Sequence, residues 1–77
     1  MINYNELKNL LNTGYDIEFS YKGKEYSIVK TKNDLISFCE FYCEPSEFTS
    51  VDDFMKNATI NGYNLSDIWE KVTDLYY

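Results

Sequence analysis

The chain has 77 residues, of which 44% are hydrophobic and 18% aromatic, and its formal net charge at pH 7 is −6. This length allows one domain, residues 1–77, and this hydrophobic content excludes an intrinsically disordered chain. There is no histidine, and the two cysteines, Cys39 and Cys43, are too few ligands for a zinc site, so we expect no metal and no cofactor.

Residues 3–13 are predicted to form a helix. Asn3 can act as the N-cap, with Glu6 three positions later completing a capping box. Leu7, Leu10 and Leu11 fall on one face at helical spacing. Gly14 then ends the helix, because it adopts positive φ without strain.

The period changes to two after residue 14. Hydrophobic residues alternate with polar ones over residues 15–21, and again over residues 25–30, with a turn at Lys22-Gly23-Lys24 between them. This pattern predicts a β-hairpin. Residues 35–43 fit either a helix or a strand, and we favour a third antiparallel strand because an isolated hairpin is only marginally stable. Buried, reduced thiols are expected for Cys39 and Cys43.

The segment 44–47 contains the single proline and breaks the pattern. Ser50 is expected to cap a short helix, and Asn64, with Asp67 at the third helical position, to cap another. Residues 75–77 fit the end of that helix or a short edge strand. The prediction is an α+β domain of order α-β-β-β-α-α, with a three-stranded antiparallel meander covered by helices on one face. The expected core residues are Leu7, Leu10, Leu11, Ile17, Phe19, Ile28, Phe54, Ile68 and Trp69.

Charge is unevenly distributed along the chain. Residues 1–32 hold five lysines and four carboxylates, whereas residues 33–77 hold two lysines and nine carboxylates. An acidic field of this kind repels nucleic acid and anionic membranes and attracts basic surfaces. Three interpretations remain open: solubility, a binding face that imitates nucleic-acid phosphates, and self-association through the abundant tyrosines.

Candidate partner-binding residues cluster in the loop and helix start after the third predicted strand. The carboxylates would set the association rate and the salt dependence, while two aromatic side chains would supply anchoring energy. These residues are Glu40, Glu44, Glu47, Asp52 and Asp53, with Tyr42 and Phe48. Lysines also flank the hairpin tyrosines, but the chain has no arginine and its net charge opposes phosphate, so direct nucleic-acid binding is not expected.

Three segments of the chain resemble small, largely uncharacterised proteins of Gram-positive phages and mobile elements. They are IEFSYKGKEYSI (17–28), FY (41–42) and ATINGYNLSDIW (58–69). These are core and turn residues, so the resemblance implies neither a reaction nor a site. Small acidic proteins of such elements include inhibitors of host defence, anti-CRISPR proteins among them, and the resemblance therefore implies an inhibitor.

Catalysis is not expected, because no histidine, nucleophile–base pair or phosphate-binding glycine loop is present. We expect a monomeric, cytoplasmic binding protein that docks its acidic part on a basic host protein, such as a nucleic-acid-binding nuclease. The alternative is a self-associating structural or regulatory protein held by an edge strand or a tyrosine patch. No leader or membrane-spanning run is seen in the sequence.

Overall fold

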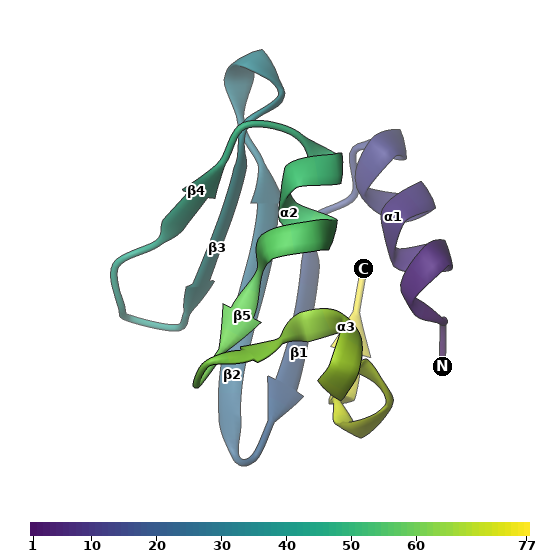
Figure 1. Ribbon diagram of the computed structural model, residues 1–77, viewed down its shortest axis with the longest axis vertical. Helices are drawn as coiled ribbons and strands as arrows, with labels where there is room; N and C mark the ends of the chain where they lie inside the picture. The colour runs from purple at the N-terminus through teal and green to yellow at the C-terminus, as the bar shows by residue number, and fades with distance from the viewer.

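The computed structural model describes residues 1–77 and contains a five-stranded antiparallel sheet with helices on one of its faces (Figure 1). The strand order is β4-β3-β2-β1-β7. The sheet strands are β1 (Ile17–Tyr21), β2 (Lys24–Lys30), β3 (Ile36–Glu40), β4 (Ser46–Phe48) and β7 (Thr73–Tyr76). The remaining elements are α1 (Tyr4–Thr13), η1 (Lys32–Asp34), α2 (Val51–Asn57), the small hairpin of β5 (Thr59–Ile60) and β6 (Tyr63–Asn64), α3 (Leu65–Ile68) and η2 (Trp69–Lys71).

The predicted N-terminal helix is confirmed as α1. The Asn3 side chain accepts a hydrogen bond from the Glu6 backbone N–H at 2.8 Å, and Glu6 Oε1 accepts one from the Asn3 N–H at 3.0 Å. This capping box satisfies two donors that the first turn leaves unpaired. Gly14 ends the helix with φ of 104°, a left-handed conformation that favours glycine.

The predicted hairpin is also confirmed. Ile17 lies opposite Ile28 and Tyr21 lies opposite Lys24, so a two-residue turn joins β1 to β2. Both turn residues have positive φ, 50° at Lys22 and 78° at Gly23, as a type I′ turn requires. The turn therefore fixes the register, and with it the face of the sheet to which each side chain points.

The third strand is confirmed as β3, but the α-β-β-β-α-α order is wrong. The sheet has five strands rather than three, because β4 pairs with the outer edge of β3 and β7 pairs with the outer edge of β1. Pairing at both edges satisfies backbone N–H and C=O groups that a three-stranded sheet would leave without partners. The α+β class itself is correct.

The second C-terminal helix is much shorter than predicted. α3 begins directly after Asn64, as predicted, but spans only four residues. Asn64 makes no side-chain capping hydrogen bond, and it also belongs to β6, where it pairs with Thr59. After the η2 turn the chain enters β7, so Leu75 and Tyr76 lie in an edge strand, which is one of the two predicted alternatives. Leu75 packs on the core, while Tyr76 lies opposite Glu18.

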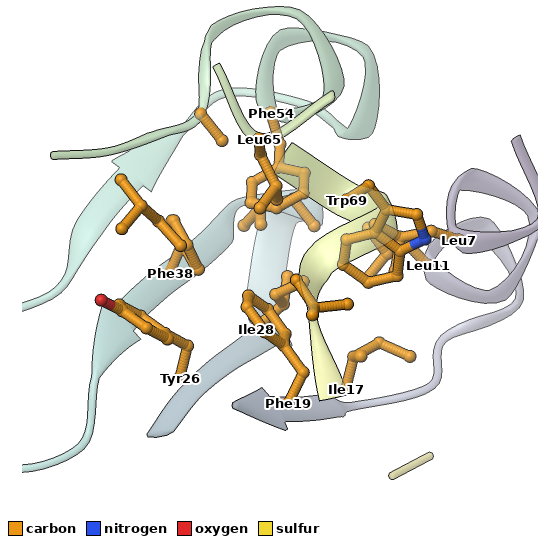
Figure 2. Close-up of a cluster of buried hydrophobic side chains, with 14 of the residues drawn as sticks. Leu7, Leu11, Ile17, Phe19, Tyr26, Ile28, Phe38, Phe54, Leu65 and Trp69 are labelled. Carbon is orange, nitrogen blue, oxygen red and sulfur yellow. The ribbon is translucent and has the colours of Figure 1, made fainter. Parts of the chain in front are cut away.

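The core lies between the sheet and the helices, and its 17 buried residues are all hydrophobic. Leu7 and Leu11 of α1 and Phe54 of α2 meet sheet residues such as Phe19 and Ile28 (Figure 2). Of the nine predicted core residues, eight are buried and Leu10 is half-buried against the cluster. Because the helices cover one face only, the other face of the sheet is left without a covering layer (Figure 1).

Candidate partner-binding surface

The uncovered face of the sheet, called the open face below, is formed by the strand residues that alternate with the core. On β1, Ile17, Phe19 and Tyr21 are buried, so Glu18 and Ser20 point to the other side. The registers of the neighbouring strands extend this assignment across the sheet. The open face carries Glu18 and Ser20 of β1, Glu25, Ser27 and Val29 of β2, Ser37 and Cys39 of β3, Glu47 of β4, and Thr73 and Tyr76 of β7.

The open face is acidic and holds no strand lysine. Glu18, Glu25 and Glu47 are exposed, and none of them takes part in an ion pair. The two lysines of the strands, Lys24 and Lys30, lie two positions along β2 from the buried Tyr26 and Ile28, respectively. Alternate residues of a strand point to the same face, so both lysines lie on the helix side.

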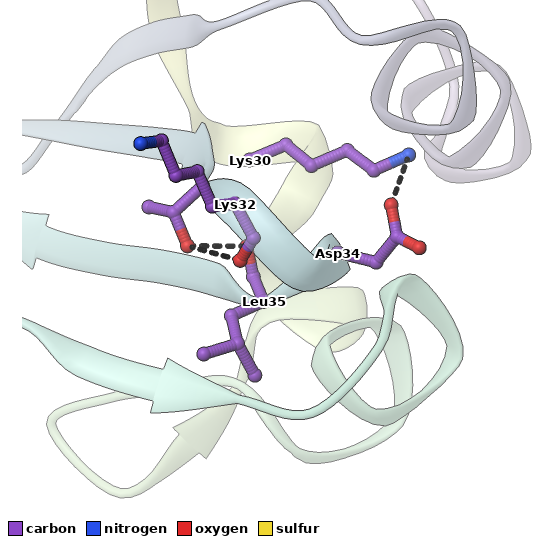
Figure 3. A network of polar contacts seen from close by, with 5 residues as sticks. Lys30, Lys32, Asp34 and Leu35 are labelled. Carbon is purple, nitrogen blue, oxygen red and sulfur yellow. Dashed lines mark hydrogen bonds and ion pairs between the residues drawn. The ribbon is translucent and has the colours of Figure 1, made fainter.

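The hairpin lysines are engaged within the molecule. Lys24 Nζ lies 3.9 Å from Glu40 Oε1. Lys30 Nζ lies 3.6 Å from Asp34 Oδ1, as Figure 3 shows. The Lys22 ammonium group lies 5.6 Å from the centre of the Tyr21 ring. These contacts leave the hairpin without a continuous basic surface for phosphates.

A hollow of about 160 Å³ indents the open face where β1 lies between β2 and β7. Ser20 lines the hollow, and its side chain is shorter than those of the other lining residues. A bulge in β7, with Asp74 at φ 53°, shifts the register between the Glu18–Tyr76 and Ser20–Thr73 pairs. The lining side chains are Glu18, Glu25 and Asp74, with the aromatic rings of Phe41 and Tyr76.

Three of the predicted site carboxylates are occupied by contacts within the chain. Glu40 pairs with Lys24, and Asp52 Oδ1 lies 2.9 Å from Lys8 Nζ. Asp53 accepts hydrogen bonds from Thr49, both from its backbone N–H at 2.9 Å and from its hydroxyl at 3.2 Å. Asp52 and Asp53 lie in the first turn of α2, where carboxylates interact favourably with the helix dipole.

The hydrogen bonds of Asp53 affect its ionisation. The backbone N–H of Thr49, followed by the Asn57 side chain, holds the pKa of Asp53 below its ordinary value. Ser50 also caps α2 as predicted, since its hydroxyl accepts a hydrogen bond from the Asp53 N–H at 3.0 Å. Asp53 therefore has a clear structural role at the start of α2.

The other predicted site residues do not form one surface with these carboxylates. Tyr42 is fully exposed and Glu44 is exposed in the loop between β3 and β4, at the opposite end of β4 from α2. Phe48 is half-buried, and its ring lies perpendicular to that of Phe54 with the centroids 5.4 Å apart. Glu47 is the one predicted residue that lies on the open face.

Sequence reasoning missed Glu18, Glu25, Asp74 and Tyr76. The alternation of Ile17, Phe19 and Tyr21 with polar residues already indicated a polar strand face, but Glu18 and Glu25 were counted in the segment that the lysines nearly neutralise. The alternation within the strands was therefore the signal that could have found this surface.

The expectation of two buried thiols is wrong, since neither cysteine is fully buried. Cys43 is exposed in the loop after β3, while Cys39 is half-buried on the open face. Cys39 Sγ lies 3.5 Å from the Ser27 hydroxyl oxygen on the neighbouring strand. Both thiols are free, and Cys43 is the accessible one.

No family model, curated protein or solved structure matches the chain. The protein contains no group of three or more cysteine, aspartate or glutamate side chains placed to hold a metal ion. None of its helices combines the length and the apolar character that crossing a bilayer requires. Its function is accordingly inferred from the chemistry of the open face.

Proposed function

We propose that this protein is a binding protein rather than an enzyme, and that it engages a basic, nucleic-acid-handling protein through its open face. The observation that carries the proposal is the charge of that face, which holds Glu18, Glu25, Glu47 and the bulge residue Asp74 without any strand lysine. A groove that binds nucleic acid gains much of its affinity from phosphate charge, so a surface of carboxylates competes for it.

The resemblance of residues 17–28 and 58–69 to small phage and mobile-element proteins directs the proposal toward inhibition of host defence. A defence nuclease presents the lysine- and arginine-lined channel that such a surface complements. Occupying this channel excludes the nucleic acid, and inhibition then requires no chemical step by the inhibitor.

The open face combines charge with aromatic side chains, which have different roles in binding. The carboxylates accelerate encounter with a basic partner and make the affinity salt-dependent. Tyr76, which is 74% exposed, and Phe41 supply apolar contact area beside them. Tyr42 is fully exposed in the loop after β3, and its ring meets that of Phe41 edge to face with the centroids 6.3 Å apart, so it adds a further aromatic contact.

The test compares two variants that carry the same change in net charge. One removes three open-face charges (Glu18→Gln, Glu25→Gln and Glu47→Gln), and the control removes three exposed charges elsewhere (Asp34→Asn, Asp67→Asn and Glu70→Gln). The immobilised proteins are exposed to a Gram-positive lysate, and recovered proteins are identified by mass spectrometry and assayed for nucleic-acid binding by mobility shift.

We expect wild type and the control variant to recover a basic protein and to block its binding of nucleic acid, with both effects weakened by salt. The open-face variant should lose both effects. Equal recovery and equal inhibition by the two variants would show that the open face is not the binding surface.

A second candidate function is self-association, favoured by tyrosines at the β7 edge. The Tyr15 and Tyr77 rings meet edge to face with centroids 6.1 Å apart, and Tyr76 is exposed beside them. Dimerisation through the open faces would oppose like charges, so a dimer would use this tyrosine edge instead. Size-exclusion chromatography with light scattering distinguishes the two candidate functions. A dimer that forms as the concentration rises, and that the Tyr77→Ser variant no longer forms, supports self-association.

A further inference from the structure

We propose that the hollow around Ser20 receives an arginine side chain of the partner. This inference rests on the proposed function and specifies its chemistry. Three carboxylates, Glu18, Glu25 and Asp74, approach the hollow from three different strands, and no cation of this chain pairs with any of them. Because like charges around one hollow repel each other, an incoming cation is favoured there.

The size of the hollow fits one side chain. Its volume of about 160 Å³ is close to that of a cavity that accommodates a single benzene molecule, about 150 Å³. A guanidinium group with its neighbouring methylene groups is a planar object of similar extent. The short Ser20 side chain lets such a group approach the sheet, while the longer side chains around it form the walls.

The arrangement of the carboxylates favours an organic cation over a metal ion as the occupant. Glu18, Glu25 and Asp74 all line the hollow, yet no group of three such side chains in the protein is placed to hold a metal ion. Metal–oxygen bonds of about 2.0–2.6 Å require ligands that converge on a point. A guanidinium group instead distributes its five N–H donors around a plane and can reach carboxylates that stand apart.

The aromatic walls favour arginine over lysine. Tyr76 on β7 lies opposite Glu18, and the Phe41 N–H donates to the Glu25 carbonyl on β2 at 2.8 Å, so the two aromatic residues line the hollow from opposite sides of β1. A guanidinium group stacks on an aromatic ring while its edges donate hydrogen bonds to carboxylates. A lysine ammonium group is a compact, strongly hydrated charge and gains less from these walls.

The carboxylates of the hollow also differ from those on the helix side in having no lysine partner. Glu40, Asp34 and Asp52 each already have a lysine partner in the protein. An added arginine would have to displace that lysine before it could pair with them. No lysine has to be displaced from the carboxylates of the hollow, and a cation of the partner therefore binds there more readily.

The experiment measures the affinity of octa-arginine and octa-lysine peptides for the protein by calorimetry at low salt, and maps the contacts by amide chemical shifts. Tyr76→Leu removes one aromatic wall, with Tyr63→Leu as the matched control at another exposed tyrosine. Asp74→Asn removes one charge and keeps a residue that tolerates positive φ, with Asp67→Asn as its control. Glu18→Gln tests the hollow without altering the bulge.

We expect octa-arginine to bind more tightly than octa-lysine, with the largest shifts around Ser20. Tyr76→Leu should weaken octa-arginine binding about two- to five-fold, as expected for an exposed cation–π contact, and reduce the preference over octa-lysine. Asp74→Asn and Glu18→Gln should weaken binding more than Asp67→Asn does. Tyr63→Leu should leave it unchanged.

The possible failures are distinguishable. Binding that is lost in the triple open-face variant but is unaffected by Tyr76→Leu, Asp74→Asn and Glu18→Gln overturns the arginine hollow and leaves the proposed function standing. Equal affinities for the two peptides likewise overturn the choice of arginine. An absence of octa-arginine binding, or equal weakening by Asp67→Asn and Asp74→Asn, overturns the arginine hollow. The open face itself is overturned only if the triple open-face variant and its control recover and inhibit the partner equally.

Discussion

Trp69 is the residue whose removal should most damage the fold. Its side chain is 2% exposed, and its ring centroid lies 5.5 Å from that of Phe19 on the sheet and 5.9 Å from that of Tyr4 on α1. The indole N–H donates a hydrogen bond to the Ile2 carbonyl at 2.9 Å. One side chain therefore joins the sheet, the N-terminal helix and the residues that precede that helix.

The magnitude follows from these contacts. Replacing a buried tryptophan by alanine costs about 3–5 kcal/mol through lost burial and the cavity left behind. A domain of this length has a total stability of about 4–12 kcal/mol, so Trp69→Ala should remove a large share of it. Trp69→Phe keeps a ring in the core but loses the hydrogen bond, which should cost about 1 kcal/mol beyond any change in packing.

The assay is urea unfolding followed by far-ultraviolet circular dichroism, because Trp69 is the single tryptophan and its fluorescence disappears in the variants. Tyr63→Ala is the control, since this aromatic side chain is 61% exposed and its loss should change stability by no more than about 0.5 kcal/mol. If Trp69→Ala were as stable as that control, Trp69 would not be a core residue and the packing described above would be wrong.

Further predictions concern ionisation and thiol reactivity. Burial raises the pKa of Tyr4 to about 12, above its value of about 10 in the unfolded chain. The protonated hydroxyl therefore contributes its full stabilisation below about pH 10, and this contribution is lost as the pH rises through the pKa of the folded state. Tyr4→Phe should cost about 1 kcal/mol at neutral pH and remove the latest-ionising phase of the ultraviolet titration, and an unchanged titration would contradict the assignment. The backbone N–H of Thr49 lowers the pKa of Asp53, so wild type should be more stable than Asp53→Asn at neutral pH. This difference in stability should decrease below about pH 4, and a difference that stays constant there would contradict the lowered pKa. Native protein should show one fast-reacting thiol, Cys43, and one slow thiol, Cys39, and loss of the fast phase in Cys39→Ser instead of Cys43→Ser would reverse this order.

The N-terminal half of the fold was predictable because its signals are local. Asn3 and Glu6 satisfy each other's backbone donors within four residues, and Gly14 ends the helix through its own backbone conformation. The Lys22-Gly23 turn likewise sets the hairpin register without help from distant residues. A sequence read in short windows contains all of this information.

The C-terminal half depends on pairing between distant segments. β4 has three residues and β7 has four, too few for a clear alternation, and each exists because a neighbouring strand has an unpaired edge. The Asn64–Asp67 pattern predicts a helix start, and α3 does begin directly after Asn64, but it ends after four residues at Ile68. The chain then enters β7, which pairs with β1, so tertiary pairing takes the place of the rest of the predicted helix.

At the candidate site, too, the charge summed along the sequence differs from the charge that the fold places on one face. Summed along the sequence, Glu18 and Glu25 are cancelled by Lys24 and Lys30 of the same hairpin. A strand separates successive side chains onto opposite faces, however, and the two lysines pair with Glu40 and Asp34 away from the open face. The electrostatic field that a partner meets is the sum over one face, and on that face the carboxylates of the nearly neutral segment join Glu47 and Asp74 without a compensating lysine.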